Sequence, residues 1–497
     1  MEARDLLNGG KPALIWRTMI ADTETPIGAA TKLIAEGRGD FLLESVEGGA
    51  SRGRYSLLGL NPDLVFRATG NDAAINREWR SDRDAFVACS DASLSALREL
   101  VADCRIDTPE TLPPALACLV GYFGYETMAL VEKLPEPSAD GLGLPDMLFV
   151  RPTQILVFDG LTEKLFAIAP LWPTGQLPEE QIAAAAEQID VTLNMLFDAS
   201  PRQTQAQSLE NEAPELTSMV DPGNYADMVA QAKEYIEAGD VFQVVLAQRF
   251  TTTFTLPPLD LYRALRRINP SPFLYFLDLP GFALVGSSPE ILVRVRDGEV
   301  TVRPIAGTRP RGDNEAEDRE AQESLLSDPK ECAEHLMLLD LGRNDVGRVS
   351  QKGSVTVTDS FSVERYSHVM HIVSNVIGQL APDRTALDAL FAGFPAGTVS
   401  GAPKIRACQI IAELEPEKRG PYAGGVGYFA PDGSIDSCII LRTGVVKDQT
   451  LHIQAGAGIV ADSEAEYEKR ECEAKAGALI AAAKEAVRIA HANGGAA

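Results

Sequence analysis

Two pairs of glutamates are the residues in this chain whose type and spacing first suggest chemistry. Glu331 and Glu334 are three residues apart, and so are Glu468 and Glu471, in two segments expected to be helical. This spacing places both carboxylates of a pair on one helical face. If the two faces meet, the carboxylates repel one another unless a hard cation holds them. Mg²⁺ fits best, because it takes oxygen ligands and keeps positions for water or an anionic substrate.

An ordinary explanation is also open, because most glutamates lie on solvated helix surfaces. For Glu331 and Glu468 taken alone, that explanation is the better one. Asp328, Pro329 and Glu331 also fit the N-cap, N1 and N3 positions of a helix, which gives Glu331 a capping role. The spacing by itself therefore leaves a metal site and a solvated surface as alternatives.

The first 198 residues contain short apolar runs between turns, which predict strands, and one alanine-rich periodic run, which predicts a helix. The predicted strands are 40–45, 55–60, 116–122 and 147–158, and the helix is 182–197. From 199 to 221 the chain is polar and has no apolar period, which predicts a linker.

The second half also contains many strand-like runs joined by short turns, which predicts mostly antiparallel sheets. Strands are predicted at 241–254, 273–279, 283–285, 291–296, 300–304, 425–429, 437–446 and 451–457. Helices are predicted from 222 or 224 to 238, and at 318–327, 329–343, 386–391, 403–414 and 463–491.

Composition excludes several classes of protein. The 497 residues include 45 basic and 71 acidic side chains, a formal charge of -26 that argues against nucleic acid and acidic membranes as partners. We find no run of 18 apolar residues and no charged-then-apolar leader, so a cytoplasmic protein is expected. Seven cysteines, an odd number without paired spacing, indicate reduced thiols.

Six longer motifs resemble, in order, those of the chorismate-utilising enzymes. They are 286–290 (GSSPE), 304–312 (PIAGTRPRG), 330–348 (KECAEHLMLLDLGRNDVGR), 366–371 (YSHVMH), 394–404 (FPAGTVSGAPK) and 454–460 (QAGAGIV). The match covers about residues 222–485. Four amino-terminal motifs resemble the regulatory region of the large, chorismate-binding subunits of anthranilate synthases: 22–26 (DTETP), 42–45 (LLES), 53–56 (GRYS) and 121–126 (GYFGYE).

This resemblance implies an α+β fold, in which two mostly antiparallel sheets form a sandwich flanked by helices and both halves of the chain belong to one packed body. It also implies a division into an N-terminal regulatory region at 1–198, a linker at 199–221 and a chorismate-binding catalytic domain at 222–497.

The resemblance further implies how the chain holds chorismate, a dianion whose ring carboxylate needs a cation. Glu334 and Glu471 match the direct Mg²⁺ ligands of the family, and Glu331 and Glu468 match residues that hold the waters of the metal. Lys475 lies one turn after Glu471 and would be a second cation for the same carboxylate. An ordinary surface Glu–Lys pair explains the spacing of Lys475 equally well.

The other substrate contacts are also implied by matching positions. Arg442 and Tyr422 match residues that bind the second carboxylate, for which the fork of an arginine is well suited. Gly456 and Gly458 leave backbone N–H groups open to an anion, although a β-bulge is the alternative explanation. The remaining implied substrate contacts are Gly307, Thr308, Thr398 and Ala457.

Glu290 matches the general acid that protonates the departing C4 hydroxyl, and burial would keep it protonated near neutrality. His371 matches the group that acts at C2 while pyruvate is eliminated, and Thr308 is grouped with it as catalytic. The alternatives are a glutamate that begins a strand and a histidine with a structural role.

Two further positions separate this chain from sister enzymes. Gln243 stands where isochorismate and salicylate synthases have a lysine that activates water, and Ala306 stands where aminodeoxychorismate synthases have a lysine that attacks the ring. The amide of Gln243 cannot activate water, and the methyl group of Ala306 cannot attack the ring. Both residues favour direct amination by ammonia, which gives 2-amino-2-deoxyisochorismate and then anthranilate, in tryptophan biosynthesis.

Three other functions are alternatives for this sequence. An enzyme that stops at aminodeoxyisochorismate is only weakly excluded. The complete set of matched catalytic residues argues against a silent tryptophan-sensing subunit. A magnesium phosphotransferase would need a phosphate-binding loop, which the sequence lacks.

Partners follow from cysteine spacing and from the amino-terminal motifs. None of the seven cysteines has a neighbouring glycine, as the nucleophile of a glutaminase would, so ammonia is expected from a separate glutamine amidotransferase subunit. L-tryptophan is the expected feedback inhibitor, although a core strand packed on a proline turn also explains these segments. The residues implied to bind it are Glu44, Ser45, Asn269, Pro270, Pro272, Phe273, Leu274 and Cys438.

Overall fold

The computed structural model describes residues 3–47, 51–135, 139–198, 215, 217–220, 222–312, 314–366 and 369–494. Most of the predicted linker lies outside these residues. Near its end, Thr217–Ser218 forms the short strand β12, which pairs with β13 (Gln243–Thr253).

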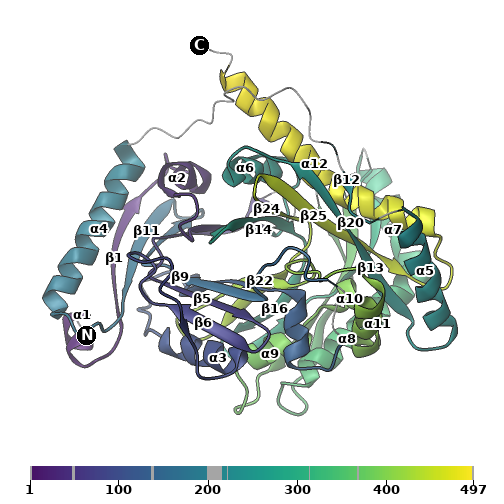
Figure 1. Ribbon diagram of the computed structural model, residues 1–497, viewed down its shortest axis with the longest axis horizontal. Coiled ribbons are helices and arrows are strands. Elements are labelled where there is room, and N and C mark those ends of the chain that lie inside the picture. Colours follow the sequence, from purple (N-terminus) through teal and green to yellow (C-terminus); the bar gives the residue numbers. More distant parts are fainter. Residues whose placement is uncertain are drawn as a thin grey trace.

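Two large sheets form the body of the protein, and every strand pair among the described residues is antiparallel (Figure 1). The first has 13 strands in the spatial order β1 (Ala13–Ile20), β11 (Lys164–Leu171), β10 (Gln154–Asp159), β4 (Tyr55–Leu60), β2 (Phe41–Glu47), β14 (Phe273–Leu279), β15 (Phe282–Ser288), β24 (Thr443–Lys447), β25 (Thr450–Ile459), β13 and β12, with β21 (Gly401–Ala402) beside β13 and β3 (Ser51–Arg52) beside β2.

The second sheet has 12 strands in the order β18 (Ile305–Pro310), β20 (Val369–Gln379), β17 (Glu299–Val302), β16 (Ile291–Arg296), β23 (Ile435–Ile439), β22 (Gly425–Phe429), β8 (Leu119–Phe123), β9 (Met147–Arg151), β5 (Leu64–Thr69), β6 (Asp72–Asn76) and β7 (Val87–Ala88), with β19 (Thr356–Arg365) beside β20.

Helices flank the two sheets (Figure 1). They are α1 (Ala3–Asn8), α2 (Pro26–Leu33), α3 (Ser93–Asp103), α4 (Pro178–Asp198), α5 (Pro222–Glu237), α6 (Pro258–Ile268), α7 (Glu315–Ser327), α8 (Pro329–Gly347), α9 (Ala386–Gly393), α10 (Gly397–Ser400), α11 (Lys404–Leu414) and α12 (Ala465–Gly494), together with the 3₁₀ helix Tyr125–Leu130. Among the described residues, none of these helices combines the length and the apolar character needed to cross a membrane.

Both halves of the chain contribute to both sheets. In the first sheet β2 pairs with β14, and in the second β8 pairs with β22. One continuous hydrophobic core contains residues from both halves, including Leu42 and Leu274. The predicted α+β class and the shared sandwich are therefore confirmed.

Two predicted strands are wrong in the same way. Residues 147–158 form β9 in the second sheet and β10 in the first, and residues 437–446 form β23 in the second sheet and β24 in the first. The chain changes sheet at Pro152 in one case and at Arg442, whose φ is 48°, in the other. Each segment has apolar residues on both sides of a short polar stretch at the crossover, 151–154 (RPTQ) in one and 442–443 (RT) in the other.

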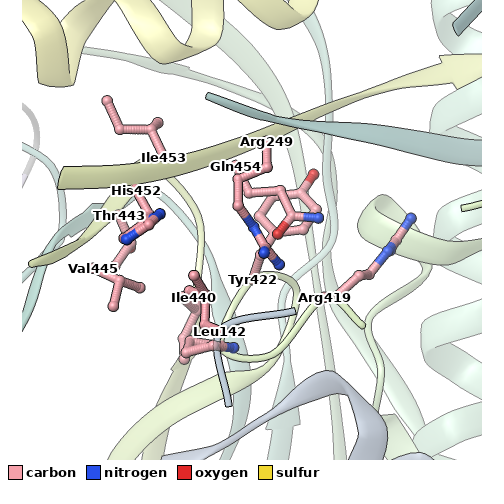
Figure 2. A pocket seen from close by; sticks show the side chains of 11 residues that line it. Leu142, Arg249, Arg419, Tyr422, Ile440, Thr443, Val445, His452, Ile453 and Gln454 are labelled. Carbon is pink, nitrogen blue, oxygen red and sulfur yellow. The ribbon is translucent and has the colours of Figure 1, made fainter. Parts of the chain in front are cut away.

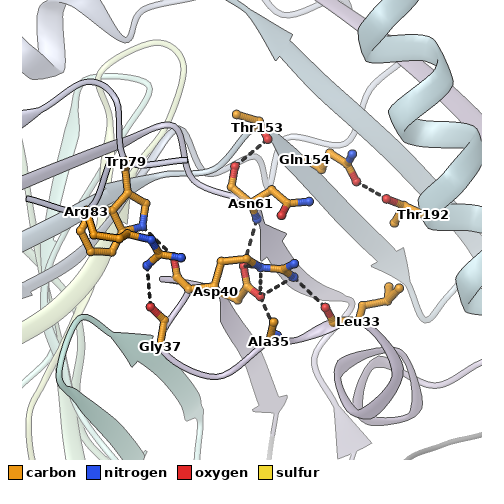
Figure 3. A network of polar contacts seen from close by, with 11 residues as sticks. Leu33, Ala35, Gly37, Asp40, Asn61, Trp79, Arg83, Thr153, Gln154 and Thr192 are labelled. Carbon is orange, nitrogen blue, oxygen red and sulfur yellow. Dashed lines mark hydrogen bonds and ion pairs between the residues drawn. The ribbon is translucent and has the colours of Figure 1, made fainter. Parts of the chain in front are cut away.

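The start of β2 is held by the carboxylate of Asp40 (Figure 3). It accepts hydrogen bonds from the backbone N–H groups of Ala35 at 3.0 Å and Asn61 at 2.9 Å, and from Nε of Arg38 at 2.8 Å. These contacts fix the strand that carries Glu44 and Ser45.

Candidate active site

The first glutamate pair lies at the N-terminal end of α8, which packs against β18 and β20. Asp328 caps this helix by accepting hydrogen bonds from the N–H groups of Lys330 at 2.9 Å and Glu331 at 3.4 Å, so the predicted N-cap is confirmed. The carboxylate of Glu331 accepts a hydrogen bond from Nη1 of Arg309 at 2.9 Å. Sequence reasoning missed this partner, which binds Glu331 to the edge strand β18.

The second carboxylate of that helix, Glu334, contacts a residue predicted to be catalytic. Nε2 of Gln243 on β13 donates a hydrogen bond to Oε1 of Glu334 at 3.2 Å. The contact joins the first sheet to the helix that covers the second.

The second glutamate pair lies in the first turns of α12. Glu468 is buried, and burial together with the charge of Glu471 raises its pKa. Lys475 forms an ion pair with Oε1 of Glu471 at 2.7 Å and donates a hydrogen bond to the carbonyl of Gly456 at 2.8 Å. The charge of Lys330 on α8 also acts on Glu468, which indicates that the N-terminal ends of α8 and α12 lie near each other.

The donor chemistry of these two helices suits a hard cation with few protein ligands. Glu334 and Glu471 each have one oxygen bonded to a neighbouring side chain, which is compatible with Mg²⁺ held by one or two carboxylates and by water. Within the described ranges, no three His, Cys, Asp or Glu side chains group closely enough to hold a metal ion on their own. The predicted Mg²⁺ site therefore remains a prediction.

Glu290 lies between β15 and β16, and it has the environment that a general acid needs. Only 6% of the residue is exposed, and burial raises its pKa to about 8. The hydroxyl of Thr398 donates a hydrogen bond to Oε2 of Glu290 at 3.0 Å. Thr398, predicted to contact substrate, thus also holds the predicted acid.

His371 and Thr308 are cross-strand neighbours on β20 and β18. Nδ1 of His371 lies 2.9 Å from the carbonyl oxygen of Gly307 and 3.1 Å from Oγ1 of Thr308. A carbonyl oxygen only accepts, so Nδ1 carries the proton and Nε2 is left as the basic nitrogen. Burial is the main cause of the lowered pKa of His371, which favours the neutral imidazole.

The shape of β18 explains why Gly307 is a glycine. Its φ is 69°, and the pairing register of β18 shifts between Ala306 and Thr308. An added Cβ at Gly307 would lie 3.2 Å from Oε2 of Glu331. The bulge thus brings the predicted substrate contact at Gly307 next to the first glutamate pair.

Arg442 is the free cation that an anionic substrate needs. Its guanidinium makes no hydrogen bond or ion pair with any residue in the described part of the chain, and burial lowers its pKa. Its charge also contributes to the lowered pKa of His371, so the two groups lie near each other. An unpaired, largely buried arginine is suited to a carboxylate supplied by a ligand.

Gly456 and Gly458 make room for two other site residues. A Cβ at Gly456 would lie 2.7 Å from the hydroxyl of Tyr422, and a Cβ at Gly458 would lie 2.5 Å from Nε2 of Gln243. Because side chains alternate along a strand, the buried Ala457 points to the opposite face of β25.

Behind Tyr422 lies a cavity of about 20 Å³, room for roughly one water molecule (Figure 2). Arg419 lines it, and this arginine is bonded to Glu415 at 2.8 Å through Nε and to the carbonyls of Val399 at 2.8 Å and Val245 at 2.7 Å. Its guanidinium lies 5.5 Å from the centre of the Tyr422 ring. Arg419 therefore supports Tyr422 from behind, and nothing in its local sequence indicates that role.

The residues predicted to bind tryptophan gather at the join between the halves. Ser45 on β2 pairs with Phe273 on β14, and Glu44 pairs with Leu274. Asn269, Pro270 and Pro272 lie in the loop from α6 to β14, and Asn269 accepts a hydrogen bond from Ser287. Cys438 is on β23 of the second sheet, where it is buried beside Ser288, the residue that pairs with Phe273.

The carboxylate of Glu44 already has partners that sequence reasoning missed. The hydroxyl of Tyr262 donates to Oε2 at 2.6 Å, and Arg266 donates to Oε2 through Nε at 3.0 Å and to Oε1 through Nη2 at 2.9 Å. Both partners lie on α6, a helix that was not predicted. Their spacing of four residues on an amphipathic segment after Pro257 and Pro258 is the signal that could have found them.

The sequence matches the model of the chorismate binding enzyme family over residues 40–481. It is 53% identical over 479 residues to anthranilate synthase component 1 of Cereibacter sphaeroides, which covers 96% of this chain and 95% of that relative. It is 48% identical over 447 residues to anthranilate synthase component 1 of Pseudomonas putida, at coverages of 89% and 90%.

The structure is similar to anthranilate synthase component I from Streptococcus pneumoniae, with a TM-score of 0.76, 36% identity, and coverage of 93% of this chain and 99% of that chain. It shares the fold of the menaquinone-specific isochorismate synthase of Escherichia coli, with a TM-score of 0.71, 18% identity, and coverages of 96% and 99%.

Proposed function

The chain belongs to the chorismate-binding enzymes, and from that premise we propose that it is the large subunit of an anthranilate synthase. Chorismate and ammonia are converted to 2-amino-2-deoxyisochorismate and water, and the intermediate then loses pyruvate to give anthranilate. The observation that carries this proposal is Gln243, a neutral amide bonded to Glu334 where a water-activating base would otherwise stand. Ammonia is already a nucleophile and needs no such base.

In the first half-reaction a C2–N bond forms and the C4–O bond breaks. Glu290 donates the proton with which the departing hydroxyl leaves as water. A carboxyl with a pKa of about 8 is largely protonated at neutral pH, as this role requires.

In the second half-reaction the C2 proton and the enolpyruvyl group are lost, which makes the ring aromatic. Nε2 of His371 takes the C2 proton, because Nδ1 is committed to the carbonyl of Gly307. The lowered pKa of His371 keeps this nitrogen free of a proton at neutral pH.

The substrate carboxylates are bound by cations of the chain. Arg442 and Tyr422 receive the carboxylate of the enolpyruvyl group, and Lys475 receives the ring carboxylate. Mg²⁺, held by Glu334 and Glu471 with Glu331 and Glu468 around it, would neutralise charge on the ring carboxylate.

Ammonia comes from a separate glutamine amidotransferase subunit. Burial raises the pKa of the thiols of Cys104 and Cys472 to about 11 and raises that of Cys118 well above its usual value, which makes them poor nucleophiles. We place the enzyme in the cytoplasm and assign L-tryptophan as a feedback inhibitor that binds between β2 and the loop before β14.

Activity of the purified chain tests this proposal directly. Chorismate, Mg²⁺ and ammonium should give anthranilate fluorescence and an equal amount of pyruvate, whereas glutamine in place of ammonium should give neither. Glu334→Gln and Glu471→Gln should each remove the Mg²⁺-dependent turnover and leave thermal unfolding unchanged. Isochorismate as the product, or glutamine use by the chain alone, would contradict the proposal.

A further inference from the structure

The carboxylate of Glu44 makes a buried contact that the proposed reaction does not explain. Only 6% of this residue is exposed, and two side chains of one helix, Tyr262 and Arg266, donate three hydrogen bonds to its carboxylate. The guanidinium uses two of its nitrogens, which is the strong two-pronged form of this pair. Because three of its roughly four acceptor sites are used and the residue is buried, Glu44 has little room for a ligand amino group unless one of these donors moves.

A second position for the side chain of Arg266 is available in a neighbouring cavity. It lines a cavity of about 170 Å³ between α6 and the C-terminal half of α12, together with Asp260, Ile489 and Ala490. Oδ1 of Asp260 accepts a hydrogen bond from Arg263 at 2.8 Å, and its Oδ2 is buried without a hydrogen-bond partner in the described part of the chain. The cavity therefore offers the guanidinium both space and an unsatisfied acceptor.

The helices α6 and α12 connect this cavity to the predicted Mg²⁺ and substrate site. α6 packs against α12, and the first turns of α12 carry Glu468, Glu471 and Lys475. The helix α12 therefore contacts α6 in its C-terminal half and carries predicted site residues in its first turns. A shift of α6 can reach the predicted Mg²⁺ and substrate site through this helix.

We propose that Arg266 is a two-position switch, which holds Glu44 in the uninhibited enzyme and moves into the α6–α12 cavity toward Asp260 when an amino-acid ligand places its ammonium on Glu44. The proposal rests on the proposed inhibition by tryptophan and supplies its mechanism. The ammonium takes over the charge of the guanidinium, and the displaced Arg266 shifts α6 against α12. The ligand inhibits because it favours this second arrangement over the first.

Arg266→Gln separates the switch from a structural role. Glutamine competes less for Glu44 and cannot carry the charge into the cavity, so tryptophan should bind at least as tightly as to wild type, measured by titration calorimetry. Inhibition of ammonium-dependent anthranilate formation should weaken roughly 5- to 150-fold, the usual range of coupling between two sites. Arg267→Gln is the matched control, because it removes the same charge from the next residue. The side chain of Arg267 is largely exposed and forms a long ion pair, at 3.9 Å, with Glu485.

Two further measurements test the switch if Arg266→Gln unfolds at a lower temperature than the wild type and its inhibition cannot be interpreted. Asp260→Asn keeps the Glu44 contact and removes the charge of the second position, so binding and inhibition should weaken together. Indole-3-propionate, which lacks the amino group of tryptophan, should not inhibit the wild type, because it leaves Arg266 in place.

The outcomes distinguish the switch from the proposed regulation. If tryptophan neither binds nor inhibits the wild type, both are overturned. If the wild type is inhibited but Arg266→Gln behaves like Arg267→Gln, or loses binding and inhibition in equal measure, only the switch is overturned.

Discussion

The side-chain amide of Gln243 donates a 3.2 Å hydrogen bond to the carboxylate of Glu334, and so connects β13 of one sheet with α8, which covers the other. The residue proposed to distinguish amination from water addition is thereby bonded to a predicted Mg²⁺ ligand. We therefore expect a change at Gln243 to affect Mg²⁺ binding as well as the choice of nucleophile.

Gln243→Lys should therefore weaken the Mg²⁺ response. A lysine ammonium beside Glu334 forms an ion pair that competes with the cation, so the half-saturating Mg²⁺ concentration should rise roughly 10- to 100-fold, as for other partners of metal ligands. Steady-state rates measured against Mg²⁺ concentration check this. Gln243→Leu, which lacks both the donor and the charge, should shift the response less, and an equal shift in both variants would exclude the ion pair.

The pH dependence of turnover should report Glu290. Its pKa of about 8 means that the protonated acid is lost as the pH rises through that value, so kcat/KM should fall on the basic side with an apparent pKa near 8. Glu290→Gln cannot donate a proton, and it should lower kcat roughly 10²- to 10⁴-fold. A wild-type profile that stays flat between pH 7 and pH 9.5 would remove Glu290 from this role.

The same carboxyl should make stability depend on pH. Its folded pKa of about 8 lies above the ordinary value of 4.5, so its contribution to stability is complete below pH 4.5 and is lost as the pH rises to about 8. Glu290→Gln does not titrate, so its unfolding temperature relative to wild type should increase from pH 5 to pH 9. The corresponding change in the free energy of unfolding, relative to wild type, should be on the order of a few kcal/mol. A constant difference across this range would mean that Glu290 is not buried as a neutral acid.

His371→Ala should separate the two half-reactions. Nε2 of His371 is the nitrogen left free by the contact of Nδ1 with Gly307, so its loss should impair removal of the C2 proton more than amination. Chromatography of the products should show 2-amino-2-deoxyisochorismate in excess over anthranilate. Thr308→Ala removes the hydroxyl 3.1 Å from Nδ1 and leaves Nε2 of His371 in place, so it should impair elimination less than His371→Ala does. Equal loss of both steps in His371→Ala would contradict the role in elimination.

The sequence predicts the class of fold well, because apolar runs bounded by turns are a local property. It fails where one run supplies strands to two sheets, as at 147–158, because the polar stretch at the crossover, 151–154 (RPTQ), interrupts the apolar run too briefly to be recognised as a change of sheet. It also singles out Glu331 and Glu44 without the partners that the structure gives them. Arg309 and Arg266 are found only when distant strands and helices come together, 22 and 222 residues away in the chain.

Ser45→Ala should make the enzyme resistant to tryptophan without changing its uninhibited rate. Ser45 lies on β2 opposite Phe273, at the join between the two halves. Loss of one buried hydrogen bond to the ligand weakens binding by about 1 to 3 kcal/mol, so the inhibitory concentration should rise roughly 5- to 150-fold.

Gly53→Ala provides an independent check on the position of the Ser45 hydroxyl. A Cβ at Gly53 would lie 1.7 Å from Oγ of Ser45, so the hydroxyl must move, and this variant should also resist tryptophan. Inhibition curves at fixed chorismate and ammonium, with thermal unfolding measured for each variant, decide the question. If both variants are inhibited at the wild-type tryptophan concentration, or if tryptophan competes directly with chorismate in all three proteins, the inhibitor does not bind at this join.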